Sequence, residues 1–290
     1  ACLVGSEMCI RDRCYMLISR IWKDGIRVTT ISHSQDFIHW SEPIEMLRGR
    51  GYENQIYSMP VFKAQDLYMG LASIIHEGDR TKENFDCVDC ELTWSADGKK
   101  FDFEAMDQPV IPRGTGHYPD GEFDNSCIYA SSPVTDGQKV WVYYMGGNGQ
   151  HTNFRESSLG RAYWEVDKFA CWTGRKEGIE SILTTTTLTL SGDYVEVLAD
   201  VVDTEKDWEL AASVHPVWTE NAYEGLRMEE AVAEKSGRWI RISWKGEKLP
   251  DKSGCIRFKF KNLKIWAVRG EMEYKGHRLW EGADMENEGM

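Results

Sequence analysis

Short runs of apolar and polar residues, separated by turn sequences, occupy most of the chain and predict β-strands. Residues 15–22 and 26–33 flank Lys23-Asp24-Gly25, a sequence typical of a hairpin turn. Residues 256–260 alternate between an apolar face and a basic face. No long amphipathic helical pattern occurs in residues 14–179. We therefore predict an all-β fold.

A turn sequence containing an aspartate recurs in the first half of the chain. The copies are Ser34-Gln35-Asp36-Phe37, Ser95-Ala96-Asp97-Gly98 and a weaker one at Asp167-Lys168-Phe169. Successive copies lie about 60 to 70 residues apart, which is too long for one hairpin and fits a four-stranded unit. The recurrence predicts β-propeller blades, and the alternative is chance repetition of common turn residues.

Two successive units show the same order of four predicted strands. Their ranges are 56–63, 67–76, 86–95 and 100–104, then 124–133, 139–147, 157–164 and 168–172. Residues from 15 to the first aspartate turn form the back half of an earlier unit. We predict a partial β-propeller of about three blades over residues 14–179.

The pattern changes near residue 180. Further strands are predicted over residues 182–190, 194–200, 208–212, 239–244, 255–260 and 263–268. Two sheets packed face to face would bury their apolar positions. We predict a β-sandwich over 180–270 and an acidic tail over 271–290.

Residues 1–13 read ACLVGSEMCIRDR and are interpreted as a translated adapter from DNA sequencing libraries, so they are excluded from the fold prediction. On this interpretation the natural N-terminus, with any signal peptide, precedes residue 14. Localisation is therefore left open between secretion and the cytoplasm.

Up-and-down strands would bring two kinds of loop to one face: those that enter a first strand and those that join strands two and three. Loops 113–124 and 146–156 are of these kinds and are rich in glycine, which lets the backbone approach a ligand. The polar side chains of interest are His76, His117, Glu122, Asp124, His151 and Arg155. We place a candidate site on this face, and the alternative is that the loops are merely solvated.

Charge and composition narrow the class of partner. The formal net charge is −13 and the sequence pI is near 5.1, which disfavours binding to nucleic acid. No apolar run approaches the roughly 18 residues of a membrane span. The 12 Trp and 12 Tyr suit sheet cores and sugar-binding clefts alike.

The cysteines are scattered and indicate no cofactor. Cys87-Val88-Asp89-Cys90 has CxxC spacing, but no second CxxC or paired histidine follows at the distance of a zinc ribbon. On a strand the two thiols would point to opposite faces. We expect buried free thiols and neither a metal site nor an organic cofactor.

Several segments together resemble the five-bladed β-propeller glycoside hydrolases, in particular family 32 (invertase and fructanase relatives), to which families 43 and 68 are related. The matching pieces are Ser34-x-Asp36-x-x-x-Trp40-x-x-Pro43, Tyr57-x-Met59-Pro60-Val61-Phe62, Glu91-Leu92-x-x-Ser95-x-Asp97-Gly98, Gly121-x-Phe123-Asp124, Trp141-Val142-Tyr143-Tyr144-x-Gly146-Gly147 and Val195-Glu196-Val197-Leu198. The resemblance covers residues 15–270. It implies a carbohydrate ligand in a central funnel.

The resemblance implies cleavage by two carboxyl groups. The nucleophilic Asp of the family would precede Tyr15, so we expect this fragment to be inactive. The family's acid, a Glu before Cys-Pro, corresponds to Ser58, which cannot act as a carboxylic acid. We therefore expect Glu122 as acid, with its pKa raised by burial, and Asp124 as base or stabiliser. His76, His117, His151 and Arg155 would bind sugar hydroxyls.

Two alternatives remain. One is a carbohydrate-binding or scaffolding propeller without catalysis. The other is a sialidase, because Ser95-Ala96-Asp97-Gly98 is similar to an Asp-box, but that function needs an arginine cluster and only Arg113 and Arg155 are candidates.

An incomplete propeller would also expose a strand edge that favours aggregation.

Overall fold

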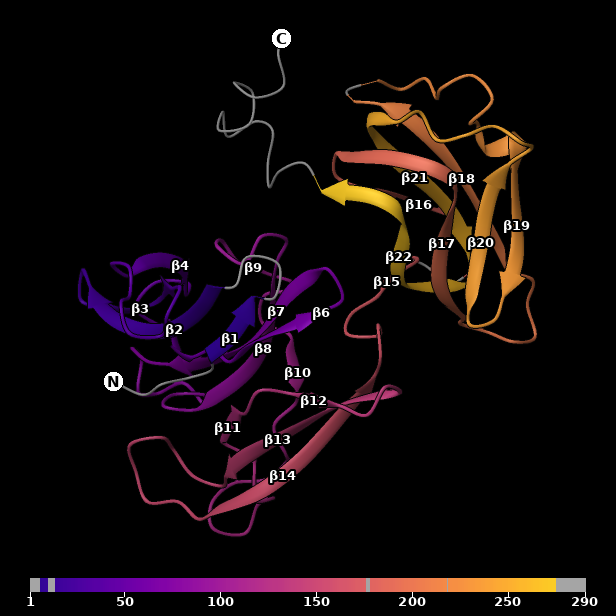
Figure 1. The fold of residues 1–290 in the computed structure, drawn as a ribbon. Coiled ribbons are helices and arrows are strands. Elements are labelled where there is room, and N and C mark those ends of the chain that lie inside the picture. Colours follow the sequence, from indigo (N-terminus) through magenta and orange to yellow (C-terminus); the bar gives the residue numbers. More distant parts are fainter. Residues whose placement is uncertain (1–5, 10–13, 176–177, 218, 275–290) are drawn as a thin grey trace. The chain divides into compact units, whose positions relative to one another are not determined.

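The computed structural model describes residues 6–9, 14–175, 178–217 and 219–274, and within them no α-helix occurs. The regular elements are strands and one short 3-10 helix, Met228–Glu230. The prediction of an all-β fold is confirmed. The chain divides into two compact units, Ala1–Val166 and Asp167–Met290, each built from β-sheet (Figure 1). No helix in the described part of the chain is long and apolar enough to cross a membrane.

The first sheet of unit 1 contains four antiparallel strands in chain order. They are β1 (Ser6–Cys9), β2 (Cys14–Lys23), β3 (Ile26–Ser34) and β4 (Ile44–Arg48). β1 lies in the segment interpreted as an adapter, and its backbone pairs with the first residues of β2. The remaining residues of that segment lie outside the described part. β4 was not predicted.

The second sheet of unit 1 contains ten strands. They are β5 (Asn54–Ser58), β6 (Val61–Ala64), β7 (Leu67–His76), β8 (Val88–Ser95), β9 (Asp102–Phe103), β10 (Pro109–Ile111), β11 (Cys127–Ala130), β12 (Val134–Thr135), β13 (Lys139–Gly147) and β14 (Ser157–Glu165). The bounds of β7 and β13 are those predicted. β11 joins β8 in parallel through Cys127 and Val88, which makes the sheet continuous.

Two of the predicted aspartate turns share one set of hydrogen bonds. In each turn the Asp side chain accepts hydrogen bonds from the backbone amides two and three residues later. The hydroxyl of the Ser two residues before the Asp accepts from the backbone amide of a residue with positive φ, Phe37 or Gly98. Asp36 Oδ1 accepts from Ile38 and His39 at 2.8 Å, and Asp97 Oδ1 accepts from Lys99 at 2.8 Å and Lys100 at 3.3 Å. These turns join β3 to β4 and β8 to β9, so they serve the fold. The third predicted copy, Asp167, instead pairs with Arg238 at 3.9 Å.

Strand register brings several loops to one edge of the ten-stranded sheet, which is formed by the ends of β5, β7, β8, β11 and β13 and not by an outermost strand. The aligned residues are Asn54 with His76, Ile75 with Val88, Val88 with Cys127, and Cys127 with Gly147. Loops 77–87, 112–126 and 148–156 all leave from this edge. The core beneath it contains fully buried residues such as Ile56, Leu71 and Ile74.

Unit 2 is one eight-stranded sheet. Its strands are β15 (Trp172–Thr173), β16 (Ser181–Thr184), β17 (Leu188–Val201), β18 (Glu209–Pro216), β19 (Ala231–Ser236), β20 (Trp239–Trp244), β21 (Lys252–Lys261) and β22 (Leu263–Tyr274). Trp244 on β20 is fully buried and donates from Nε1 to Ala212 O on β18 at 3.1 Å. Strands β17, β18, β20, β21 and β22 therefore share one core.

The unit boundary differs from the one expected near residue 180. β15 lies before that point and pairs with β22 through Trp172 and Ile265, which attaches it to unit 2. β22 also runs to Tyr274, into the segment predicted as a tail. Residues 275–290 lie outside the described part.

Candidate functional site

A cavity of about 680 Å³ lies where loops 77–87 and 112–126 meet the N-terminal end of β8. Its volume is in the range of small-molecule sites. Asp89 and Arg113 line it together with Glu83, His117 and Asn125. The lining is therefore rich in groups that donate or accept hydrogen bonds.

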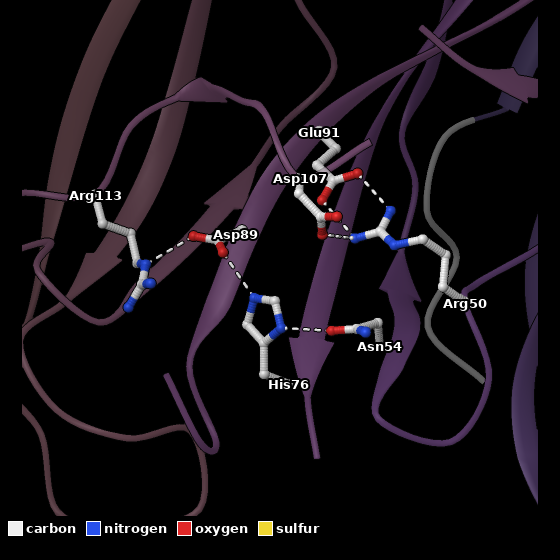
Figure 2. A network of polar contacts seen from close by, with 7 residues as sticks. All are labelled: Arg50, Asn54, His76, Asp89, Glu91, Asp107 and Arg113. Carbon is white, nitrogen blue, oxygen red and sulfur yellow. Dashed lines mark hydrogen bonds and ion pairs between the residues drawn. The ribbon is translucent and has the colours of Figure 1, made fainter. Parts of the chain in front are cut away.

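Asp89 is buried and is held by a chain of polar contacts (Figure 2). Its Oδ1 accepts from Arg113 Nε at 2.7 Å, and its Oδ2 lies 2.7 Å from His76 Nε2. The other ring nitrogen of His76, Nδ1, lies 2.8 Å from Asn54 Oδ1. Because His76 ends β7 and Asn54 begins β5, the register of three strands builds this chain.

The environment of Asp89 favours the ionised carboxylate. Burial by itself raises the pKa of this carboxyl, but the hydrogen bonds with His76 and Arg113 and their charges outweigh it, so the pKa lies below its ordinary value. Asp89 is ionised at neutral pH. It can accept hydrogen bonds or stabilise positive charge, but it is unsuited to donating a proton.

Glu91 forms a second buried charged contact beside the first (Figure 2). Both of its oxygens accept from Arg50 at 2.9 Å, and Arg50 also pairs with the exposed Asp107 at 2.8 Å. The hydrogen bonds with Glu91 raise the pKa of Arg50. This bidentate pair ties β8 to the residues that precede β5.

Glu122 is exposed, so the expectation that burial raises its pKa is wrong. Its Oε2 accepts from Thr115 N at 2.5 Å and from Thr115 Oγ1 at 2.9 Å. These hydrogen bonds, the backbone one first, lower the pKa of Glu122. A carboxyl with this environment favours the ionised form, whereas a general acid needs the protonated form.

Asp124 is buried, and its Oδ2 accepts from Tyr144 Oη at 2.8 Å. Burial, and then this carboxylate, raise the pKa of Tyr144 to about 12. A Cβ atom on Gly114 would lie 3.0 Å from Glu122 Oε2 and closer still to Asp124 Oδ1. Both predicted carboxylates therefore flank Gly114, a residue of the cavity wall.

The predicted histidines and arginine separate into two groups. His117 lines the cavity, with Nε2 at 3.9 Å from Glu83 Oε1, and His76 lies behind Asp89. His151 and Arg155 are not among the residues that line the cavity. His151 instead contacts the hydroxyl of Tyr129, and Arg155 Nη1 donates to the carbonyl of His151. Burial lowers the pKa of His151.

Asn125 lines the cavity and carries an unsatisfied donor, which packs against Gly121. The residue is 6% exposed, and its Oδ1 accepts from Ser126 Oγ at 2.6 Å. Its Nδ2 is buried and has no hydrogen-bond partner in the described part of the protein. Buried polar groups are normally paired, so this amide group stands out among the residues that line the cavity.

The cysteines of the CxxC sequence are free thiols, and both are buried. Burial raises the pKa of Cys90 to about 12, which disfavours the thiolate needed for metal binding or redox chemistry. Across residues 14–175, 178–217 and 219–274, no group of three or more His, Cys, Asp or Glu residues is arranged to hold a metal ion.

Asp89, Asn125 and the Asn54–His76 contact were not among the site features predicted from the sequence. One signal was present, since Val88-Asp89-Cys90-Glu91-Leu92 places two carboxylates at alternate positions of a strand that is otherwise apolar. Charged residues in such a strand need partners, and they mark a paired or functional position.

No protein-family model and no curated protein matches the chain. Among solved structures, an N-acetylgalactosamine deacetylase from F. plautii in complex with blood group B trisaccharide is similar, with a TM-score of 0.41 and 14% identity over 57% of this chain. The chain spans half of that protein's length. A structure described as a glycoside hydrolase gives a TM-score of 0.38 and 12% identity over 96% of this chain and 88% of its own. A fructofuranosidase from Schwanniomyces occidentalis complexed with fructose gives 0.33 and 8% over 92% and 94%.

Proposed function

We propose that the protein is glycoside hydrolase-like and binds a carbohydrate in the cavity beside Asp89. The observation that carries this proposal is that Asn125, a residue that lines the cavity, has a buried amide nitrogen without a hydrogen-bond partner. A sugar hydroxyl is both a donor and an acceptor. It can therefore accept from Asn125 while it donates to a carboxylate such as that of Asp89.

The sequence resemblance supports the same ligand class and gives the proposal a structural form. In that form unit 1 belongs to a five-bladed propeller of the family 32 type, and the eight-stranded sheet of unit 2 folds over its shared core to form the two layers of a β-sandwich. The matching aspartate turns at Asp36 and Asp97 support repeated blades.

Hydrolysis of the bound sugar is a second candidate function. It is favoured by the convergence of Glu122 and Asp124 on Gly114 in the cavity wall. In this proposal Glu122 donates the proton and Asp124 acts as base or stabiliser. Because the pKa of Glu122 is lowered, its protonated fraction grows only as the solution becomes acidic, so the rate would rise as pH falls.

Binding is tested with two buried asparagines that differ in their partners. Asn125→Ala removes the unpartnered donor, whereas Asn148→Ala removes a side chain that exchanges hydrogen bonds with Glu156 at 2.8 and 3.2 Å. A panel of neutral mono- and oligosaccharides is titrated into the full chain by calorimetry. We expect Asn125→Ala to weaken sugar binding about tenfold with little loss of stability.

Asn148→Ala is expected to give the opposite result, with lower stability and unchanged sugar affinity. Absence of binding by every sugar, or equal affinity in the native protein and Asn125→Ala, would contradict the proposal. Hydrolysis is tested separately in the full-length protein, with the same panel between pH 4 and 8. Turnover that is unchanged in Glu122→Gln and Asp124→Asn would remove both residues from catalysis.

A further inference from the structure

A second cluster of side chains in unit 1 combines arginines with aromatic rings. It consists of Arg20 on β2, Arg27 on β3, Tyr57 on β5, Tyr129 on β11, and His151 and Arg155 on loop 148–156, and we name it the arginine–tyrosine cluster. We propose that this cluster binds the carboxylate group of an acidic ligand. The inference does not depend on the cavity, whose lining includes none of these residues.

Tyr57 lies at the centre of the cluster. The guanidinium carbon of Arg20 is 4.4 Å from the centroid of its ring, and that of Arg27 is 5.9 Å away. The ring of His151 lies at 4.6 Å from the same ring and that of Tyr129 at 6.0 Å. Residues distant in sequence therefore place two guanidinium groups around one aromatic ring.

The positive charges of this cluster are only partly neutralised. Arg27 pairs with Glu77 at 2.5 Å, yet its buried Nε has no hydrogen-bond partner. Arg20 donates to the carbonyl of Tyr57 at 2.8 Å, and Arg155 donates to backbone carbonyls. Within the described residues, no carboxylate pairs with Arg20 or Arg155.

Asp86 acts electrostatically on His151, but its carboxylate already accepts two hydrogen bonds. Asp86 Oδ2 accepts from the amide and the hydroxyl of Thr152, at 2.8 and 2.5 Å. Burial is the main cause that lowers the pKa of His151; Asp86 opposes it, and the charges of Arg155, Arg27 and Arg20 add to it. The electrostatic influence of all three arginines thus reaches His151, consistent with a locally positive site.

Guanidinium groups favour carboxylates because their planar donors match the two oxygens. Arg20 is exposed, and Tyr57, Tyr129, His151 and Arg155 are half-buried, so a ligand can reach them. The rings supply a flat apolar surface for the remainder of the ligand. An uncharged ligand would leave Arg20 and Arg155 without an anionic partner.

The test compares D-glucuronate with D-glucose, which share a pyranose ring and differ in the carboxylate. Each is titrated into the full chain by calorimetry, with the native protein, Arg20→Gln, Arg155→Gln and the control Arg161→Gln. Arg161 is exposed and lies over the ring of Trp141 at 4.5 Å, which matches the setting of Arg20 over Tyr57. We expect Arg20→Gln and Arg155→Gln each to weaken glucuronate binding about tenfold or more, and Arg161→Gln to leave it unchanged.

Asn125→Ala separates this site from the cavity. The arginine–tyrosine cluster predicts that glucuronate still binds more tightly than glucose in this variant. It also predicts that raising the salt concentration weakens glucuronate binding. Equal affinity for the two sugars in the native protein, no binding of glucuronate, or the same loss in Arg161→Gln as in Arg20→Gln would overturn the inference.

Discussion

Asp89 and Glu91 lie two positions apart on β8, and their carboxylates leave the strand on one face, each held by a different arginine (Figure 2). Arg113 reaches Asp89 from the loop that borders the cavity, and Arg50 reaches Glu91 from the residues before β5. One buried strand therefore carries both a structural ion pair, at Glu91, and an ionised carboxylate that lines the candidate site, at Asp89.

The Glu91–Arg50 pair should contribute strongly to stability. The side chain of Glu91 is 1% exposed, so Glu91→Gln removes the negative charge and one of the two acceptor oxygens that face Arg50 in a largely buried position. We expect a loss of about 3 kcal/mol in the free energy of unfolding, measured by urea denaturation. The control is Asp107→Asn, which removes a 76% exposed partner of the same arginine and should cost less than about 1 kcal/mol. Equal losses in the two variants would contradict this assignment.

Asp89 should make stability depend on pH in the acidic range. Because its folded pKa is lowered, the unfolded chain binds more protons there, and stability rises with pH. The contribution is complete above the ordinary pKa of about 3.9 and is lost as pH falls through the lowered value. Urea midpoints measured from pH 7 to pH 2 should therefore fall less steeply in Asp89→Asn than in the native protein.

Glu122→Gln provides the comparison for that pH series. The pKa of Glu122 is also lowered, but its side chain lies in water, where its hydrogen bonds with Thr115 are weakened by solvent. We expect a smaller change of slope than in Asp89→Asn. Parallel curves for the native protein and Asp89→Asn would show that the Asp89 network does not govern the acid response.

Two glycines with positive φ distinguish steric contact from backbone strain. Gly98 has a φ of 74°, and a Cβ there would lie 3.1 Å from the ring of Tyr68; Gly137 has a φ of 91° and open space around it. Gly137→Ala should cost about 1 kcal/mol from backbone strain alone, and Gly98→Ala should cost more. Thermal unfolding measures both, and a smaller loss for Gly98→Ala would refute the close contact with Tyr68.

Thiol reactivity should follow burial. Burial raises the pKa of Cys90 to about 12 and that of Cys127 to about 11, so both should resist iodoacetamide in the folded protein. The partly exposed Cys171 serves as the reference. Peptide mass spectrometry after brief labelling should show modification of Cys171 before the other two. Early labelling of Cys90 would indicate that β8 opens readily.

The sequence by itself determined the local elements of this protein. The bounds of β13 and β20 follow from alternation between short turn sequences, because a strand with one buried face needs a period of two. Those of β7 follow from a mostly apolar run between turn sequences, and this strand is buried on both faces. The Asp36 and Asp97 turns were also predictable, since their hydrogen bonds close within a few residues. β4, β10 and β19 were missed, because pairing with neighbouring strands rather than a strong pattern defines them.

Only the tertiary structure decided which polar groups meet. Arg113 is 24 residues from Asp89, and Arg50 is 41 residues from Glu91, so strand register and loop path rather than local sequence bring them together. The same dependence left Glu122 exposed although the sequence favoured a buried acid, and it separated His151 and Arg155 from the cavity. A residue's type fixes the chemistry available to it, whereas the residues packed around it fix its pKa and its partners.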